Sequence, residues 1–167
     1  MDGDRKAQFE IYKLYYKAMY NTSLRIVKDT MEAEDIMQEA FLSAFNNLSS
    51  FKGEVAFGAW LKRIVINKSI DGLKKNKLLV EDISQTEDIP DEYSTTLETE
   101  LPYNLEEIKK AIFQLPDNYR VIVSLYLLEG YDHEEIAGIL DIQPSSSRAK
   151  LSRARIKLQE ILKKIKR

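Results

Sequence analysis

Apolar residues recur at three- and four-residue spacing in two stretches of this chain, and that period predicts helices in both. The first stretch is expected to hold helices over residues 9–28, 29–48 and 59–75. The second is expected to hold helices over residues 105–115, 117–129, 132–140 and 144–164. Only six glycines interrupt the pattern in the whole chain. The sequence therefore predicts an all-α protein.

Helix start and stop signals support these boundaries. Asp29-Thr30-Met31-Glu32 has the spacing of a capping box, and so does the stretch from Asp132 to Glu135. Pro116 ends one predicted helix, and Asp117 can cap the next. Pro144 suits the first position of the last helix. Each of these signals agrees with the apolar period beside it.

The charges divide the chain in the same way. Residues 1–80 carry 13 basic and 10 acidic side chains, and residues 108–167 carry 12 and 7. Residues 81–107 carry ten acidic side chains and no basic one, without an apolar period. We expect two small helical domains, 1–78 and 105–167, joined by an acidic flexible linker, 79–104, whose simplest role is that of a solvated tether. The basic blocks favour polyanionic partners.

Composition argues against an enzyme. The chain has no cysteine, one histidine and no glycine-rich phosphate-binding motif, so we expect no metal, no cofactor and no catalysis. We expect His133 to be solvated beside a helix cap. No apolar run approaches the roughly 20 residues that a membrane span needs, and the first residues are polar. A cytoplasmic protein is the expectation.

The helix predicted over 29–48 has two contrasting faces. Its apolar face is expected to form core and consists of Met37, Ala40, Phe41, Ala44 and Leu48. Asp35, Gln38 and Glu39 lie on the opposite face, and Leu42 falls among them. A single exposed leucine is ordinary, but an apolar centre with a polar rim is also typical of a protein-binding patch. The spacing alone leaves both interpretations open.

A second surface combines aromatic and basic side chains. Phe51, Lys52 and Phe57 lie in the loop before the third helix. On that helix, one side carries Trp60, Arg63, Asn67, Asp71 and Lys74. Such interleaving suits single-stranded nucleic acid, because bases stack on rings while cations follow phosphates. The alternative is that Trp60 packs into the core beneath Phe57.

The last two predicted helices, with their tight turn at Asp141-Ile142-Gln143, have the layout of a helix-turn-helix. Ser147, Leu151, Ala154 and Leu158 share the packing face of the final helix. Its outward face is small and basic, with Ser145, Ser146, Ala149, Ser152 and Arg153, and with Arg148 and Lys150 at the edges. Small residues let a helix backbone approach base edges in a major groove. A solvated basic helix is the alternative.

Taken together, the segments "AEDIMQEAFLSAF", "WLKRIVINKSIDGLKK" and "LPDNYRVIVSLYLLEGYDHEEIAGILDI" through "RAKLSRAR" resemble a bacterial RNA polymerase sigma factor of the extracytoplasmic-function group. The resemblance covers most of the chain outside the linker, and the order and spacing of the motifs agree with it. It implies the second and fourth conserved domains of the sigma-70 family. It also implies a function, which is to direct core polymerase to promoters and to help melt them.

The resemblance assigns roles to residues and partners. The polymerase-binding helix, which meets the clamp helices of the largest subunit, would use Glu34, Asp35, Gln38, Glu39 and Leu42. Capture of the unpaired minus-ten strand would use Phe51, Lys52, Phe57, Trp60, Lys62, Arg63, Asn67 and Lys74. The minus-thirty-five element would be read by Ser145, Ser146, Arg148, Ala149, Lys150, Ser152 and Arg153. The implied partners are core RNA polymerase, including its flap region, promoter DNA and an anti-sigma factor.

The chain departs from the family pattern at four places. Asp141 stands where the turn usually has glycine, and Ser147 stands where the packing face usually has valine. Ser145-Ser146 replaces the usual Gly-Thr, and Gly58-Ala59 replaces the usual threonine before Trp60. Two other functions remain open from the residues: a helix-turn-helix regulator that acts without polymerase, and an adaptor of protein-binding helices. Co-purification with core polymerase would separate them.

Overall fold

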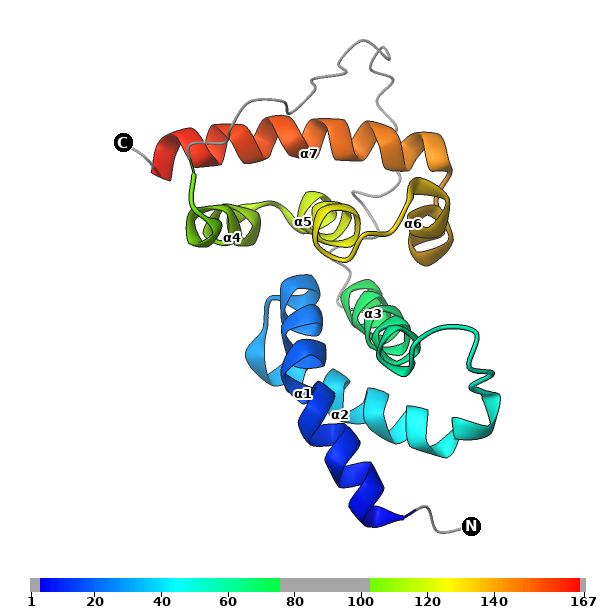
Figure 1. Cartoon of the computed structure of the whole chain (residues 1–167). Coiled ribbons are helices and arrows are strands. Elements are labelled where there is room, and N and C mark those ends of the chain that lie inside the picture. Colours follow the sequence, from blue (N-terminus) through cyan, green and yellow to red (C-terminus); the bar gives the residue numbers. More distant parts are fainter. Residues whose placement is uncertain (1–3, 76–102, 166–167) are drawn as a thin grey trace. The chain divides into compact units, whose positions relative to one another are not determined.

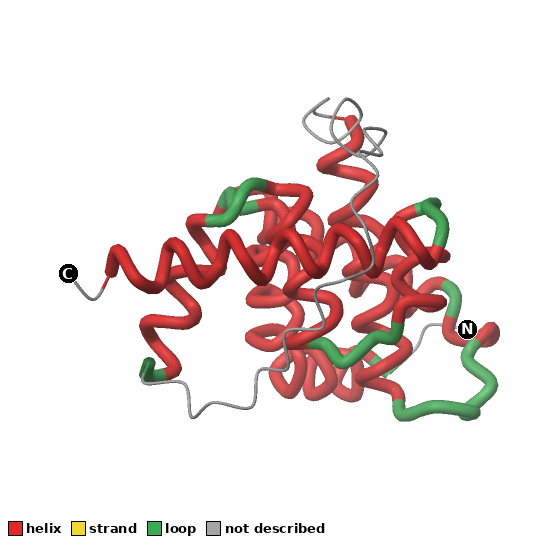
Figure 2. The backbone as a smooth tube through the Cα atoms, turned by 90° about the horizontal axis from the view of Figure 1, so that it is seen from above, coloured by secondary structure: helices red, strands yellow, loops and turns green. Residues whose placement is uncertain are grey.

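The computed structural model describes residues 4–75 and 103–165. Every regular element within these ranges is helical, so the all-α expectation is confirmed (Figures 1 and 2). The chain divides into two compact units, Met1–Asn76 and Lys77–Arg167. The predicted linker, 79–104, lies outside the described residues except for its last two positions.

The first unit is a bundle of three helices. They are α1 (Arg5–Val27), α2 (Thr30–Asn46) and α3 (Phe57–Lys75), and a short 3₁₀ turn, Leu48–Ser50, follows α2. Each helix packs on the other two. The shared core consists of buried residues from all three helices: Met19, Met37, Ala40, Phe41, Ala44, Leu61 and Val65.

The local sequence explains the ends of these helices. The carboxylate of Asp4 accepts hydrogen bonds from the backbone N–H groups of Lys6 and Ala7, so α1 begins four residues before the predicted start. Asp29 caps α2 by accepting from the Glu32 N–H at 2.8 Å. The expectation that Leu48 belongs to the core is wrong. Its exposed fraction is 48%, because α2 ends at Asn46 and the 3₁₀ turn takes the chain away from the helical phase.

Gly72 allows α2 and α3 to approach closely. A Cβ atom at this position would lie 2.7 Å from Oε1 of Glu32 and 3.4 Å from Cδ1 of Ile36. Any side chain there would therefore displace Glu32 from the helix contact. Burial, with a contribution from Asp29, raises the pKa of Glu32 above its ordinary value.

The second unit places one long helix across three short ones (Figure 1). Its α-helices are α4 (Leu105–Gln114), α5 (Asp117–Val123), α6 (His133–Leu140) and α7 (Pro144–Ile165). A π-helical turn, η2 (Ser124–Leu128), extends α5 toward the loop before α6. The helix α7 packs on α4, α5 and α6, so its own orientation depends on all three.

Two expectations about the turns of this unit have different outcomes. Asp132 and Glu135 form the predicted capping box of α6, and Asp141 takes the left-handed conformation of the turn, with φ 57° and ψ 50°. Asp117 does not cap α5. Pro116 occupies the cap, and the Asp117 carboxylate instead accepts a hydrogen bond from the fully buried guanidinium of Arg120. Arg120 also donates to the Leu115 carbonyl, at 3.3 Å.

Candidate polymerase- and nucleic-acid-binding surfaces

The outer face of α2 presents one apolar residue among polar ones, as predicted from its spacing. The five residues assigned to this face, Glu34, Asp35, Gln38, Glu39 and Leu42, are all exposed. The exposed fraction of Leu42 is 63%. The side-chain amide of Gln38 donates to Oε1 of Glu34 at 3.4 Å, one turn away. The Glu39 carboxylate lies 3.7 Å from Nζ of Lys68, which ties this face to α3.

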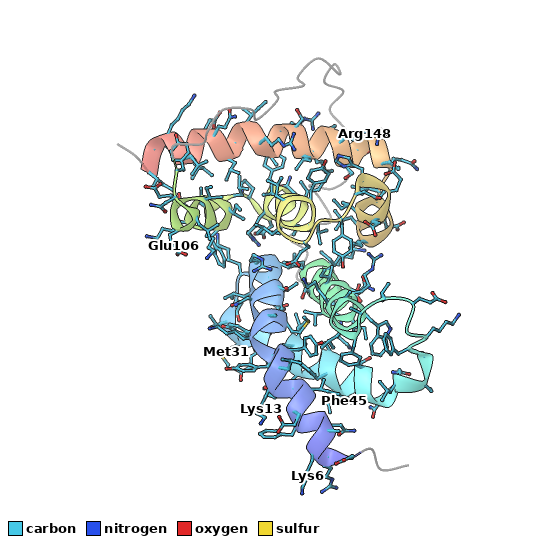
Figure 3. All side chains as sticks on the ribbon, in the orientation of Figure 1. Lys6, Lys13, Met31, Phe45, Glu106 and Arg148 are labelled. Carbon is cyan, nitrogen blue, oxygen red and sulfur yellow. The ribbon has the colours of Figure 1, made fainter. Side chains whose placement is uncertain are left out.

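Met31 adds a second apolar contact point to this face. Its exposed fraction is 77%, and it stands at the start of α2 (labelled in Figure 3). Met31 and Leu42 are eleven residues apart, so at about 100° per residue they share one side of the helix. Sequence reasoning missed Met31, although its helical phase relative to Leu42 was sufficient to find it. The α2 face is accordingly Met31 and Leu42 with the four polar residues between and beside them.

An aromatic cluster lies where the loop meets the start of α3. The ring of Phe51 is 5.2 Å from that of Trp60 and 5.6 Å from that of Phe57, centroid to centroid. Phe57 and Trp60 are 5.6 Å apart. All three rings are half-buried, and Phe57 and Trp60 pack against the core. Trp60 was expected either to stack on nucleic acid or to pack into the core beneath Phe57. It packs beside Phe57 and still keeps part of its surface exposed.

The polar side chains assigned to the minus-ten strand are mostly cationic, and all but Lys52 lie along α3, as far as Lys74 in its last turn. Lys52 and Asn67 are exposed, and Lys62, Arg63 and Lys74 are half-buried. The loop reverses at Gly53, whose φ of 73° is a left-handed conformation suited to glycine. The departure at Gly58 has a steric reason, because a Cβ atom there would lie 2.7 Å from Cε1 of Tyr15.

The outward face of α7 is small and partly basic. Ser145 and Arg148 are exposed, and the other expected members, Ser146, Ala149, Ser152 and Arg153, are half-buried. Arg148, labelled in Figure 3, pairs with Glu134 of α6 at 3.5 Å between Nη1 and Oε1. Both of these side chains are exposed, so the pair adds little stability.

Lys150 does not belong to this outward face. Its exposed fraction is 7%, so the expectation of an exposed place at the edge of the outward face is wrong, while its contact with DNA stays a prediction. The reason is its helical phase: Ser147, three residues before it, and Ala154, four residues after it, are both fully buried. The alkyl stem of Lys150 therefore covers the packing face of α7.

His133 is also placed differently from the expectation. It is half-buried, its ring stacks on that of Tyr126 with centroids 4.8 Å apart, and its Nδ1 lies 2.9 Å from Oγ of Ser147. Burial, followed by the positive charge of Arg148, holds the pKa of His133 below its ordinary value. Ser147, which stands where an apolar residue was expected, thus has a polar partner from α6.

Comparison with known proteins now decides the family. A model of sigma-70 region 2 matches residues 11–78, and a model of sigma-70 region 4 matches residues 105–158. The sigma factor SigW of Bacillus subtilis is 32% identical over 96% of this chain and 91% of its own length. The chain belongs to the extracytoplasmic-function group of sigma-70 factors.

Other relatives of this sigma factor agree. The sigma-E factor of Escherichia coli K12 is 32% identical over 92% of this chain and 85% of its own length. The fold matches the solved structure of the sigma factor RpoE of Bartonella quintana, in complex with the anti-sigma factor NepR, with a TM-score of 0.61 and 24% identity. That match covers 95% of this chain and 98% of the solved one. The resemblance to sigma factors stated from the motifs is therefore confirmed.

The family match accounts for the position of the surfaces. Region 2 contains the α2 face and the aromatic cluster, and region 4 contains α7 as far as Leu158. The protein is a sigma factor that initiates transcription at specific promoters with RNA polymerase, and sigma factors are non-catalytic. Within residues 4–75 and 103–165, no helix is both long and apolar enough to cross a membrane. The same residues contain no group of three or more side chains suited to a metal ion.

Proposed function

We propose that this sigma factor divides promoter recognition among the three surfaces described above. The α2 face binds the clamp helices of the largest polymerase subunit. The aromatic cluster, together with Lys52, Lys62, Arg63, Asn67 and Lys74, holds the unpaired strand of the minus-ten element. The outward face of α7 reads the minus-thirty-five element, and the second unit also meets the flap region of the polymerase.

The α2 face is the observation that supports this proposal most strongly. Leu42 and Met31 are more than half exposed, although the same helix buries six other residues in the core. Carboxylates and an amide surround the two apolar side chains. An apolar centre with a polar rim is the usual anatomy of a protein interface. Such an acidic face repels the phosphates of nucleic acid, so it suits a protein partner and not DNA.

Strand capture follows from the chemistry of the aromatic cluster. A base that stacks on an exposed ring gains about 1–3 kcal/mol, and each base has a π-face to offer. Phe51 and Phe57 pack against Trp60 and against each other, so the Trp60 ring is held in place before the strand arrives. A preorganised platform avoids part of the entropy cost of binding. Cations nearby attract the phosphates of the same strand.

The helix α7 alone can make only a few contacts with the DNA duplex. Arg148 and Arg153 supply phosphate contacts, and small side chains at Ser145, Ala149 and Ser152 let the backbone approach base edges. With so few cations, the free chain should bind DNA weakly and with a shallow dependence on salt. Polymerase raises the effective concentration of each surface at its own element, because both units are joined in one chain.

We further propose that an anti-sigma factor regulates the chain in the cytoplasm, where the polymerase is found. The sigma factor RpoE, which shares this fold, was solved with the anti-sigma factor NepR, and CnrH was solved with the cytosolic domain of CnrY. CnrH has a TM-score of 0.55 and 19% identity to this chain, over 96% of this chain and 90% of CnrH.

Binding to core polymerase tests the proposal. Asp35→Arg reverses one charge at an exposed position of α2 and should abolish binding while leaving thermal unfolding unchanged. Glu10→Arg on α1 is the matched control, because Glu10 is equally exposed and its ion pair with Lys13 is a surface pair of little energetic value. Normal binding by Asp35→Arg would remove the α2 face from the proposal. Tight, sequence-specific duplex binding by the free chain would favour the polymerase-independent regulator instead.

A further inference from the structure

His133 joins three segments of the second unit at one point. It is the first residue of α6, its ring stacks on Tyr126 of η2, and its Nδ1 contacts Oγ of Ser147 on α7 at 2.9 Å. On the same aromatic ring, the guanidinium carbon of Arg155 lies 5.8 Å from the Tyr126 centroid. The π-helical turn and both helices of the helix-turn-helix therefore meet at this histidine.

Ser147 needs this partner. Its exposed fraction is 0%, and it lies on the packing face of α7 with Leu151 and Ala154. A hydroxyl buried among apolar side chains is costly unless it is hydrogen-bonded, and water cannot reach this one. Nδ1 of His133 supplies the bond. This hydrogen bond is directional, so it fixes the rotation of the first turns of α7 about the helix axis. Apolar packing alone at this position would leave that rotation less restricted.

The turn that contains Ser147 also carries residues of the outward face. Ser146 and Arg148 are its direct neighbours in sequence, about 100° to either side on the helix. A small rotation of this turn moves Arg148 relative to the DNA backbone, and specific contacts tolerate only small displacements. What fixes Ser147 therefore also fixes the geometry of the DNA-reading face.

We propose that His133 is a positioning residue for promoter reading, which sets the first turns of α7 at the minus-thirty-five element through its hydrogen bond to Ser147. The inference rests on the proposed function of α7, and it adds a residue that contacts no DNA. It predicts that His133 and Ser147 act as a pair, so that changing one makes the other unimportant.

Three substitutions in the full chain separate the hydrogen bond from the ring. His133→Phe keeps the stack on Tyr126 and loses the polar atom, whereas His133→Asn loses the ring and keeps an amide near the position of Nδ1. Ser147→Val removes the hydroxyl and fills the site with apolar atoms. The double variant of His133→Phe and Ser147→Val completes a double-mutant cycle.

The assay is transcription in vitro by holoenzyme on two templates that share a minus-ten element. One template keeps the minus-thirty-five element of a promoter mapped for this sigma factor, and the other has that element scrambled. The ratio of the two outputs measures reading by α7. His133→Phe should lower the ratio about tenfold, and His133→Asn should keep it within about twofold of the unaltered chain. In the Ser147→Val background, His133→Phe should change nothing further.

An unchanged ratio for His133→Phe would overturn the inference, and so would an equal loss of output from both templates, which indicates a damaged fold. Persistence of the tenfold effect in the Ser147→Val background would also overturn it. A ratio of one for the unaltered chain would contradict the proposed function of α7 itself, and the inference with it. That last result is distinct, because it appears before any substitution is made.

The ratio of transcription from the two templates should also depend on pH, which a purely structural role of His133 would not predict. Protonated His133 would face Arg148 and Arg155 of α7, with Asp132 and Glu134 of its own helix opposing them. The two arginines repel an imidazolium at the α6–α7 contact. We expect the ratio to fall about twofold or more between pH 7.5 and 5.5 for the unaltered chain, and to stay level for His133→Asn. Parallel profiles for the two proteins would contradict the inference.

Discussion

Truncation of Leu42 should weaken polymerase binding by an amount that its exposure allows to be worked out. Burying a whole leucine side chain is worth about 1.5–3 kcal/mol. Leu42 is 63% exposed in the free chain. Roughly two-thirds of that energy, about 1–2 kcal/mol, therefore remains to be gained when polymerase covers it. Leu42→Ala should raise the dissociation constant by about 5- to 30-fold.

Leu14→Ala is the matched control for this measurement. Leu14 lies on α1 with an exposed fraction of 72%, outside the α2 face. Alanine favours helix at both positions, so neither substitution should lower the thermal unfolding temperature by more than about 2 °C. Titration of core polymerase with a fluorescently labelled chain gives both dissociation constants. Equal constants for Leu42→Ala and the unaltered chain, or an equal loss for Leu14→Ala, would refute the assignment of the α2 face.

Four further predictions follow from single residues. Arg120→Met should lower the free energy of unfolding of the second unit by about 3 kcal/mol in chemical denaturation, because it takes the donor away from the Leu115 carbonyl and the half-buried Asp117 carboxylate; an unmoved midpoint would contradict this. Lys28→Gly should stabilise the first unit by about 1 kcal/mol in thermal melts, since Lys28 has φ 63° at a helix C-terminus; a lower melting temperature would count against it. Trp60→Ala should keep closed-complex formation but slow strand opening, with about 1–3 kcal/mol of stacking lost; undiminished permanganate reactivity of promoter thymines would exclude it. Burial lowers the pKa of His133 from its ordinary value of 6.5, so the unfolded chain takes up the proton first as the pH falls. The contribution of His133 to the free energy of unfolding should be full above about pH 6.5 and should be lost as the pH drops below that value. His133→Asn should remove this component of the pH–stability curve.

Local signals in the sequence were sufficient for most of the fold. The N-caps Asp29 and Asp132 and the first-turn Pro144 stand where the structure begins its helices, and Asp141 adopts the left-handed turn conformation. These features depend on a few neighbouring residues, whose chemistry can be read directly from the order of side chains. The same holds for the exposed face of α2, which follows from a single helical period.

The structure differs from the sequence-based predictions where the position of a side chain depends on a segment that is distant in sequence or packed against it. Asp117 could cap α5 from its sequence position, but its half-buried carboxylate pairs with the buried guanidinium of Arg120 instead. Lys150 has the charge of a DNA-binding residue, yet the flank of α7 that carries it is covered by the rest of the unit. His133 is bonded to a serine fourteen positions away, and no local pattern indicates that contact. Tertiary packing decided each of these positions.

Promoter selection by this chain can be measured by transcription with purified core polymerase on a pool of genomic DNA fragments. Sequencing of the transcript 5′ ends, with and without this chain, shows whether it selects promoters. We expect new starts that share two sequence elements at a constant separation, and we expect their loss when the chain carries Asp35→Arg. Starts that are the same with and without the chain would show that it does not direct polymerase to promoters.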